Sequence, residues 1–387
     1  MLELKRKLLT NKHLTKQLYI TQKQKSRKDL KMKKLRLGLV GCGKMMGRHV
    51  EGVHLVNNVE IVSLCDVIRE NAEDVAKVLG NNPSIHTDWR DMVDEVDAVM
   101  IALPHDLHFE CGMFFALNNK HILMEKPLCN TEEECVKLIE TCEEHNVKLM
   151  CAYPVRYWKG IRKLKELIDS GDYGKVMQMS VWTEQLTGSS SEFGFADRSN
   201  RSWHTTARLG GGQLFSHGCH YIDIMLWFLG EPLYGSHVGT NVGTPWMLRE
   251  GTSAVTIKFK NGAIGYHGAT WGARGTRLAY DFQIHTEKGL IDYEHRSGEI
   301  RFYNAIAEHV PGEEDSPQKS TLIWKNDDAL GKQTQYEIQH FTECVLEDKK
   351  PLTDGRSALQ GLRVIWALYN AENNHTLANL EGLGLGE

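Results

Sequence analysis

The chain has 387 residues, of which 41% are hydrophobic and 25% charged, and its formal net charge is −4. This length suits two domains, and the composition is that of a globular protein. No stretch approaches the ~20 consecutive apolar residues of a membrane helix, and the basic N-terminal segment lacks the apolar stretch of a secretory signal. We therefore predict a cytoplasmic protein without a membrane span.

The nine cysteines are scattered and form no CxxC pair. An odd number without paired spacing predicts reduced, mostly buried thiols rather than a disulfide framework or a zinc site. The stretch His217-Gly218-Cys219-His220 could suggest a metal site, but adjacent ligands on a helix point apart and no third cluster accompanies them. We therefore predict that the protein has no metal site.

Positive charge is concentrated at the start of the chain. Residues 1–34 carry twelve Lys and Arg against two acids, which leaves −14 for the rest. A basic arm can bind nucleic acid, but this one has a single aromatic residue, Tyr19, and the body is acidic. We expect residues 1–33 to be a disordered extension, with no nucleic-acid partner.

Strand and helix patterns alternate over residues 34–155. A strand, a tight turn and a helix are expected over 35–50, further strands at 59–67, 96–104, 121–125 and 148–154, and further helices at 71–80, 106–119 and 131–146. Thr131 and Glu134 have the spacing of a capping box at the start of the last helix. Strands that alternate with helices predict an α/β domain with a doubly wound parallel sheet.

The pattern changes over residues 156–387. We expect a helix over 161–171, a strand over 174–185, a Gly/Ser-rich loop over 186–202 and a helix over 213–229. Strands with hairpin-like spacing follow at 252–260, 262–271, 279–286, 289–294 and 299–304, with a turn at Asn261-Gly262. These elements predict an α+β domain with a large, mostly antiparallel open sheet. A last helix, about 355–373, is expected to pack back on the first domain.

A glycine-rich turn follows the first strand. Gly41 suits the tight turn, and Gly43 lets the backbone approach a pyrophosphate. Lys44, Met45 and Met46 then open a helix whose free N–H groups would hold the phosphates. Met46 stands where the third glycine of the motif belongs, so the turn alone is a weak signal. The alternative is that the glycines serve only packing.

Asp66 strengthens this signal. It ends the second strand at about the distance needed to bind ribose hydroxyls. An acid here favours NAD over NADP because it would repel a 2′-phosphate, although Arg69 nearby leaves NADP open.

Glu125-Lys126-Pro127 ends the fourth strand. Open α/β sheets bind ligands beyond the carboxyl ends of their strands, so Lys126 is expected in the crevice beside the nicotinamide. Glu125 can fix the lysine ammonium or contact the cofactor, and an ammonium can stabilise a developing alkoxide. The alternative is a surface lysine in a turn.

A second cluster lies at 210–223, where three glycines lead into the expected helix. Ser216, His220 and Asp223 share one face of that helix at i, i+4 and i+7. A histidine can take a hydroxyl proton while a hydride leaves the same carbon. The alternative for His220 is a satisfied core histidine.

Together these motifs resemble the Gfo/Idh/MocA oxidoreductase family, the group of glucose–fructose oxidoreductase and inositol dehydrogenase. The resemblance covers about residues 34–375 and rests on Gly41-Cys42-Gly43 with His49, LPHDLH (103–108), EKPL (125–128), RKLKELIDSGDYGKV (162–176) and GGGQLFSHGCHYID (210–223). It implies a Rossmann domain, an open C-terminal sheet used for dimer or tetramer contacts, and NAD(P)-linked chemistry on sugars, cyclitols or glycosides. It also implies that Lys126 and His220 are the catalytic pair.

The chain departs from the family pattern at one position. Many members carry Asp four residues before the histidine, whereas this chain has Ser216, and a serine cannot act as a carboxylate partner. Either Asp223, His217 or the substrate compensates, or the preferred substrate differs from inositol-like compounds.

Further residues are expected to line the site, since aromatic rings suit sugar faces; for the aromatic candidates the alternative is packing between domains. The expected cofactor contacts also include Leu103, Pro104, His105, His108 and Glu125. The expected substrate contacts are Tyr153, Arg156, Trp203, His204, Ser216, His217 and Asp223.

The sequence therefore predicts an NAD-dependent oxidoreductase that moves a hydride between nicotinamide and a secondary hydroxyl of a sugar, cyclitol or glycoside. The pyranose 3-position follows from the resemblance only. One alternative is a glycoside-cleaving enzyme that uses transient oxidation and never releases NAD. The other is a non-catalytic nucleotide-binding regulator, whose mark would be loss of the lysine or the histidine.

Overall fold

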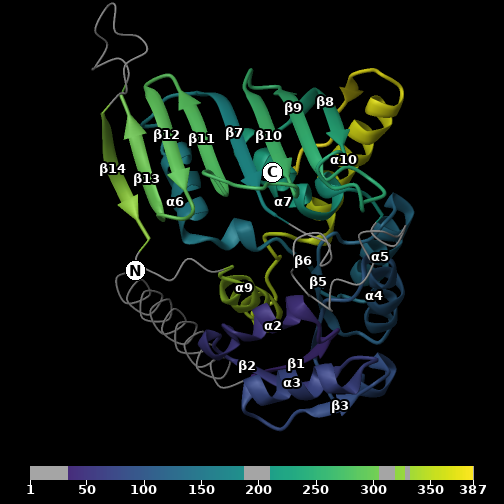
Figure 1. Cartoon of the computed structure of the whole chain (residues 1–387). Helices are drawn as coiled ribbons and strands as arrows, with labels where there is room; N and C mark the ends of the chain where they lie inside the picture. Colours follow the sequence, from purple (N-terminus) through teal and green to yellow (C-terminus); the bar gives the residue numbers. More distant parts are fainter. Residues whose placement is uncertain (1–33, 187–209, 305–318, 327–331, 387) are drawn as a thin grey trace, which may run out of the picture.

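Two β-sheets organise the residues that the computed structural model describes, which are 34–186, 210–304, 319–326 and 332–386. The sheets occupy opposite ends of the molecule, with helix α9 (Gln335–Leu346) between them (Figure 1). The predicted disorder of residues 1–33 falls outside the described residues.

The first sheet has six parallel strands in the order β3-β2-β1-β4-β5-β6. Its central strands are apolar and buried along nearly their whole length, as expected where helices cover both faces of a parallel sheet. The strands are β1 (Leu35–Val40), β2 (Val59–Cys65), β3 (Ser84–His86), β4 (Ala98–Ile101), β5 (His121–Glu125) and β6 (Leu149–Ala152).

Helices cover both faces of this sheet. Leu37 of β1 shares one core cluster with Met46 and with Phe341 of α9, whereas Val99 of β4 shares the other with Phe115 and Leu138. The predicted capping box of Thr131 is present. The helices of this half are α2 (Lys44–Val50), α3 (Arg69–Leu79), α4 (His108–Leu117) and α5 (Glu132–Glu144), with 3-10 turns at Val53–Leu55, Trp89–Met92, His105–Leu107 and Pro154–Tyr157.

The second sheet has nine strands in the order β14-β13-β12-β11-β7-β10-β9-β8-β15. All pairs are antiparallel except β7 with β10. The strands are β7 (Val176–Glu184), β8 (Pro232–Thr240), β9 (Thr252–Phe259), β10 (Ile264–Thr270), β11 (Tyr280–Thr286), β12 (Gly289–Glu294), β13 (Glu299–Tyr303), β14 (Ser320–Lys325) and β15 (Ala378–Asn379). The fold class predicted from the sequence is confirmed.

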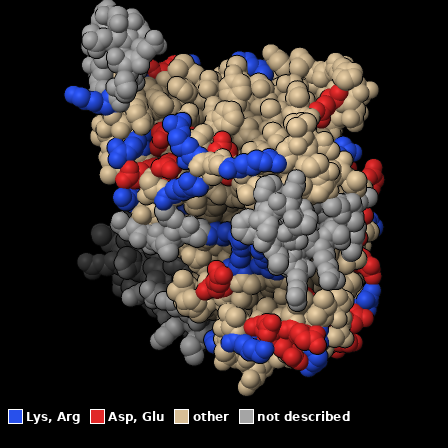
Figure 2. Space-filling model, viewed as in Figure 1, with Lys and Arg blue, Asp and Glu red and all other residues tan. Residues whose placement is uncertain are grey.

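One face of this sheet is covered by α6 (Lys159–Asp169), α7 (Cys219–Leu229) and α10 (Gly355–Asn373) (Figure 1). On the opposite face, no other described element covers Trp182, Tyr234 and Val238, which are exposed. Uncharged side chains predominate over β8, β9 and β10 in the space-filling view (Figure 2).

Helix α10 also reaches the first half of the chain. Arg356 pairs with Glu143 at 2.5 Å and Arg363 pairs with Glu132 at 2.7 Å, so two ion pairs join α10 to α5.

Some elements were not predicted. Strand β8 begins at Pro232 and contains two glycines, Gly235 and Gly239, which disfavour a strand locally. Helix α9 carries the buried Glu337 on its inner side, which interrupts an apolar pattern. Tertiary packing overrides the local signal in both cases.

All nine cysteines are buried free thiols, as predicted. Within the described ranges, every helix falls short of the length and hydropathy that a membrane crossing requires.

Candidate active site

The turn after β1 is shaped by Gly41. Its φ is +85°, and a Cβ there would lie 2.5 Å from the carbonyl oxygen of Ala102. A Cβ on Gly43 would meet no atom within 4 Å. Gly41 is therefore required by the turn itself, whereas Gly43 leaves the backbone open to a ligand.

Asp66 closes this turn from the end of β2. Its Oδ2 accepts the backbone N–H of Cys42 at 2.8 Å, and its Oδ1 accepts from Ile68 N and Asn71 Nδ2. A carboxylate has about four acceptor positions, so capacity remains for a ribose hydroxyl. Arg69 donates to Glu73 at 3.0 Å. These residues fit NAD.

We expect the two glycines to respond differently to alanine. Gly41→Ala should lower the melting temperature of the protein with or without NAD, because the new methyl group collides with backbone. Gly43→Ala should leave the melting temperature of the cofactor-free protein unchanged and raise the Kd for NAD. Thermal scans and NAD titrations would check this, and equal destabilisation by both substitutions would contradict it.

His108 does not have the expected role. It is fully buried, and its two ring nitrogens lie 2.9 Å from the carbonyl oxygens of Leu103 and Pro127. Burial lowers the pKa of His108. It thus holds the loop after β4 against the loop after β5, and we correct its assignment as a cofactor contact. His105 packs beside it, with ring centroids 5.7 Å apart, and Pro104 is exposed.

A buried histidine fixes Glu125. His49 Nε2 donates to Glu125 Oε1 at 2.7 Å, and His49 Nδ1 lies 3.6 Å from Glu337. Burial raises the pKa of Glu125, but His49, Lys126 and Lys332 outweigh it and lower the pKa to about 2. Burial and the nearby Glu125 charge raise the pKa of Glu337 well above its usual value. Glu125 is thus an anion at pH 7, whereas its surroundings favour the protonated form of Glu337.

Sequence reasoning assigned no role to His49 or Glu337. His49 stood within the glycine-rich motif, so its spacing was a signal that could have been used. Glu337 comes from α9, and nothing in its local sequence marks it.

Lys126 lies near enough to His220 for its charge to act on that histidine. Lys126 follows β5, and its Nζ donates to the carbonyl oxygen of Ser216 at 2.8 Å. Ser216 lies one turn before His220, so both groups reach one place from distant parts of the chain. Burial, and next the charge of Lys126, hold the pKa of His220 well below its usual value. The main-chain oxygen of Ser216 thus contacts the ammonium, although the side chain of Ser216 offers no carboxylate.

The helix that carries His220 is not the regular helix we predicted. Residues Leu214–Gly218 form a π-helix, with wider turns, before α7 begins at Cys219. π-Helical turns occur frequently at functional sites. Ser216 therefore lies outside the regular helix assumed for the i, i+4, i+7 face, whereas His220 and Asp223 both lie in α7.

Arg156 and Asp223 form a buried ion pair with each other, so neither charged group is available to a substrate. Arg156 Nε and Nη2 donate to the two oxygens of Asp223 at 2.5 and 2.8 Å, and the side chains are 2% and 0% exposed. A buried charge needs a partner, and each supplies the other. We therefore correct their assignment as substrate contacts.

Breaking this pair should cost stability. Arg156→Met leaves the Asp223 carboxylate buried and unpaired and should lower the free energy of unfolding by about 3–5 kcal/mol. Arg363→Met, which breaks the exposed pair with Glu132, should lower it by less than about 1 kcal/mol. Denaturant unfolding would check both, and similar losses in the two variants would contradict the assignment.

Several buried polar atoms near the pair have no partner among the described residues. They are Tyr153 Oη, Gln213 Oε1, Ser216 Oγ and His220 Nδ1. The rings of Tyr153 and His220 lie 5.5 Å apart, and those of His217 and His220 lie 5.7 Å apart. Because buried polar groups are nearly always hydrogen-bonded, this set suits a ligand rich in hydroxyl groups. Trp203 and His204 lie outside the described residues.

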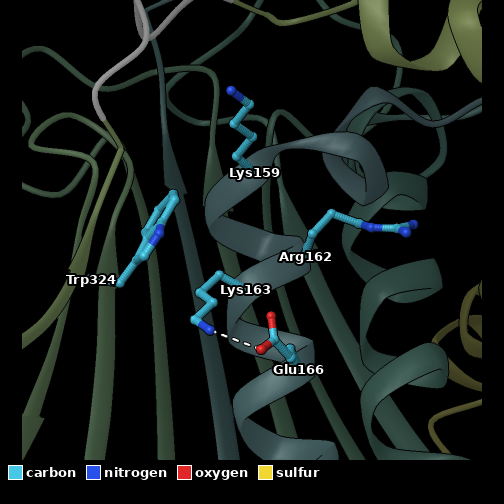
Figure 3. A pocket seen from close by; sticks show the side chains of 5 residues that line it. All are labelled: Lys159, Arg162, Lys163, Glu166 and Trp324. Carbon is cyan, nitrogen blue, oxygen red and sulfur yellow. Dashed lines mark hydrogen bonds and ion pairs between the residues drawn. The ribbon is translucent and has the colours of Figure 1, made fainter.

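A separate surface hollow lies between α6 and β14. It is lined by Lys159, Arg162, Lys163, Glu166 and Trp324. Figure 3 shows that Lys159 and Arg162 point away from each other, and Lys163 pairs with Glu166 at 2.9 Å. The charged groups do not converge, so the hollow is not part of the site. No group of three or more potential metal ligands occurs in the described part of the chain.

The fold and the turn after β1 define an NAD-binding oxidoreductase. The profile described as "Oxidoreductase family, NAD-binding Rossmann fold" matches residues 35–153, and the "GFO/IDH/MocA C-terminal domain" matches residues 161–292. Together the two matches cover more than half of the chain. The chain belongs to the Gfo/Idh/MocA family, and its first domain binds NAD.

Relatives of known activity are distant. The chain is 25% identical over 358 residues to 2,7-anhydro-N-acetylneuraminate hydratase of Escherichia coli, which covers 87% of this chain and 92% of that protein. It is 27% identical over 197 residues to glucose-6-phosphate 3-dehydrogenase of Bacillus subtilis. This aligned region covers 51% of this chain and 54% of that protein. The chain spans about half the length of other curated relatives that it matches.

Levoglucosan dehydrogenase in complex with NADH has the same fold. Its TM-score is 0.77 at 22% identity, and the match covers 90% of this chain and 99% of that structure.

Proposed function

We propose that the protein is an NAD-dependent oxidoreductase that moves a hydride between nicotinamide and a secondary hydroxyl of a sugar or cyclitol. The observation that carries this proposal is the convergence of Lys126 and His220 beside unpaired buried polar atoms. A non-catalytic regulator would have no use for such a pair.

The residues divide the chemistry between them. Lys126 donates a hydrogen bond to the substrate oxygen and stabilises its developing negative charge. His220, neutral at pH 7, accepts the hydroxyl proton as the carbinol carbon becomes a carbonyl. NAD, when bound, supplies the hydride acceptor. In the reverse direction His220 returns the proton.

Other residues support binding. We assign contacts with substrate hydroxyls to Tyr153, Ser216 and His217, supported by the unpaired Tyr153 Oη and Ser216 Oγ, and contact with the cofactor to Glu125, which His49 holds. The Bacillus subtilis relative is named for oxidation at position 3 of a hexose, which supports the pyranose 3-position as the reacting carbon.

A substrate panel tests the proposal. Sugars, inositols, sugar acids, sugar phosphates and glycosides would be incubated with NAD or NADP and scored for reduced cofactor and for 3-keto products. We expect at least one secondary carbinol to reduce NAD, and NADP to be used less well. A panel without any reduced cofactor or any product would contradict the proposal.

A second candidate is a reaction without net oxidation, in which NAD is reduced transiently and never released. The relative that spans most of both chains favours it, because that protein is named a hydratase rather than a dehydrogenase. Protein isolated with bound dinucleotide, which converts a glycoside or anhydrosugar without accumulating NADH, would identify this reaction.

We also propose that the uncovered face of the second sheet joins copies of the chain. It exposes Trp182, Tyr234 and Val238, and Val238 is 69% exposed. We expect a mass in sedimentation that is a multiple of 44.0 kDa, and Val238→Glu should shift it toward the monomer. A wild-type protein that sediments as a monomer at micromolar concentration would contradict this.

A further inference from the structure

Lys332 lies beside the cofactor turn, although no motif marked it. It starts a short segment, 332–334, that leads into α9. Its carbonyl oxygen accepts from Trp158 Nε1 at 2.9 Å, and Thr334 Oγ1 donates to the carbonyl oxygen of Arg48 at 3.3 Å. The segment is therefore fixed to both halves of the molecule.

The ammonium group of Lys332 has no carboxylate partner among the described residues. Its Nζ lies 3.5 Å from Met45 Sδ, beside the cofactor turn. Glu125 and Glu337, the acids whose charges act on it, contact His49 instead. The guanidinium of Arg48 likewise has no ion pair within the described ranges and is near enough for its charge to act on Lys332.

Positive charge thus exceeds negative charge here. Three cationic side chains, Lys126, Lys332 and Arg48, face only two carboxyl groups, those of Glu125 and Glu337. Burial lowers the pKa of Lys332 to about 8, which still leaves it mostly protonated at pH 7. A half-buried ammonium without a counter-ion is costly unless a ligand supplies one.

The positive charge of Lys332 acts on the histidines beside which hydride transfer is proposed. The charge of Lys332 lowers the pKa of both His217 and His220. The cofactor phosphates are instead expected at the open backbone of Gly43. An anion on a substrate bound beside these histidines would therefore meet the charge of Lys332, whose contact with Met45 also brings it near the cofactor turn.

We infer that Lys332, with Arg48, forms a subsite for an anionic group on the substrate, so that the preferred substrate is a sugar that carries a carboxylate or a phosphate. This inference rests on the proposed function. Because Arg48 is exposed and Lys332 is half-buried, Lys332 is assigned the closer contact with the anion.

The test compares anionic sugars with their neutral parents, in variants of Lys332 and in a control variant at another lysine. Uronates, aldonates and hexose phosphates, each beside its neutral parent sugar, would be assayed with wild type, Lys332→Gln, Lys332→Arg and the control Lys77→Gln. Lys77 is an exposed lysine of α3, far from the cleft. Separate arms for carboxylates and phosphates show which anion is preferred.

We expect wild type to prefer an anionic sugar over its neutral parent by about tenfold or more in kcat/KM, as one charge-assisted hydrogen bond allows. Lys332→Gln should remove most of this preference and leave the Kd for NAD unchanged, and Lys332→Arg should restore part of it. Lys77→Gln should change nothing.

Equal loss for neutral and anionic sugars in Lys332→Gln would overturn the inference, as would no preference in wild type. A weakened Kd for NAD with the preference intact would assign Lys332 to the cofactor instead. If no sugar is turned over at all, the proposed function fails. The inference is then judged by calorimetry of the NADH complex with the same acids, and absence of Lys332-dependent binding overturns it.

Discussion

Replacing Lys126 by methionine should lower kcat by about 100- to 1,000-fold while leaving the Kd for NAD within about twofold of wild type. Methionine keeps much of the volume of the side chain but removes the ammonium that donates to Ser216 and, in the reaction, to the substrate oxygen. The lost hydrogen bond stabilises mainly the transition state, because negative charge on the substrate oxygen develops only as the hydride leaves. Steady-state kinetics together with NAD titration would measure both quantities.

Lys120→Met provides a matched control. Lys120 Nζ also donates to a backbone carbonyl, that of Val96, at 2.9 Å, but it lies away from the cleft. This variant should retain wild-type kcat. Unchanged turnover in Lys126→Met, or equal loss in the two variants, would remove Lys126 from the mechanism.

The second large effect is expected from His220. His220→Gln should lower kcat by about 100- to 10,000-fold, because no other group would take the hydroxyl proton directly. His54→Gln, at an exposed histidine of the first domain, should have no effect. If His220→Gln is as active as His54→Gln, His220 is a core histidine, the alternative that the sequence left open.

The pH profile gives this histidine an independent signature. Its pKa is held well below 6.5 by burial and by the charge of Lys126, so the neutral, proton-accepting form prevails at pH 7. Oxidation by wild type should therefore hold its rate as pH falls to 6.5 and lose it only at lower pH, when the imidazole becomes protonated. That acidic limb should be absent in His220→Gln. A wild-type rate that already falls by half near pH 7 would contradict the lowered pKa.

Local sequence predicts the parts of the site that depend on local geometry. Position 41 requires glycine because its φ angle is positive. Lys126 could be recognised because it directly follows a buried strand of a parallel sheet. Both could be read without knowing any distant contact. The strand pattern likewise predicts the sheet, since periodicity reflects which faces are buried.

The roles of other side chains could not be predicted, because their contact partners lie far away in the sequence. Arg156 and Asp223 each look available for a substrate, and only the fold shows that each neutralises the other in a dry interior. An aspartate within the apolar run of α7 was a hint, because an acid there needs a buried partner. Lys332 belongs to the site only because a segment near the end of the chain returns to β1 and β5.

Ser216 shows a different limit. The residue type suggested a missing contact, yet the contact to Lys126 is made by the main chain, which every residue carries. Spacing on a regular helix also misplaced this region, because the π-helix Leu214–Gly218 changes which side chains share a face.

A crystal structure of the protein with NADH and its best substrate would test the central claim most directly. The account predicts that one substrate hydroxyl lies within about 3.2 Å of both Lys126 Nζ and a ring nitrogen of His220. It also predicts that the carbon bearing this hydroxyl lies about 3–3.5 Å from C4 of the nicotinamide. A substrate held with Lys126 and His220 on different atoms, or with neither near the nicotinamide, would contradict it.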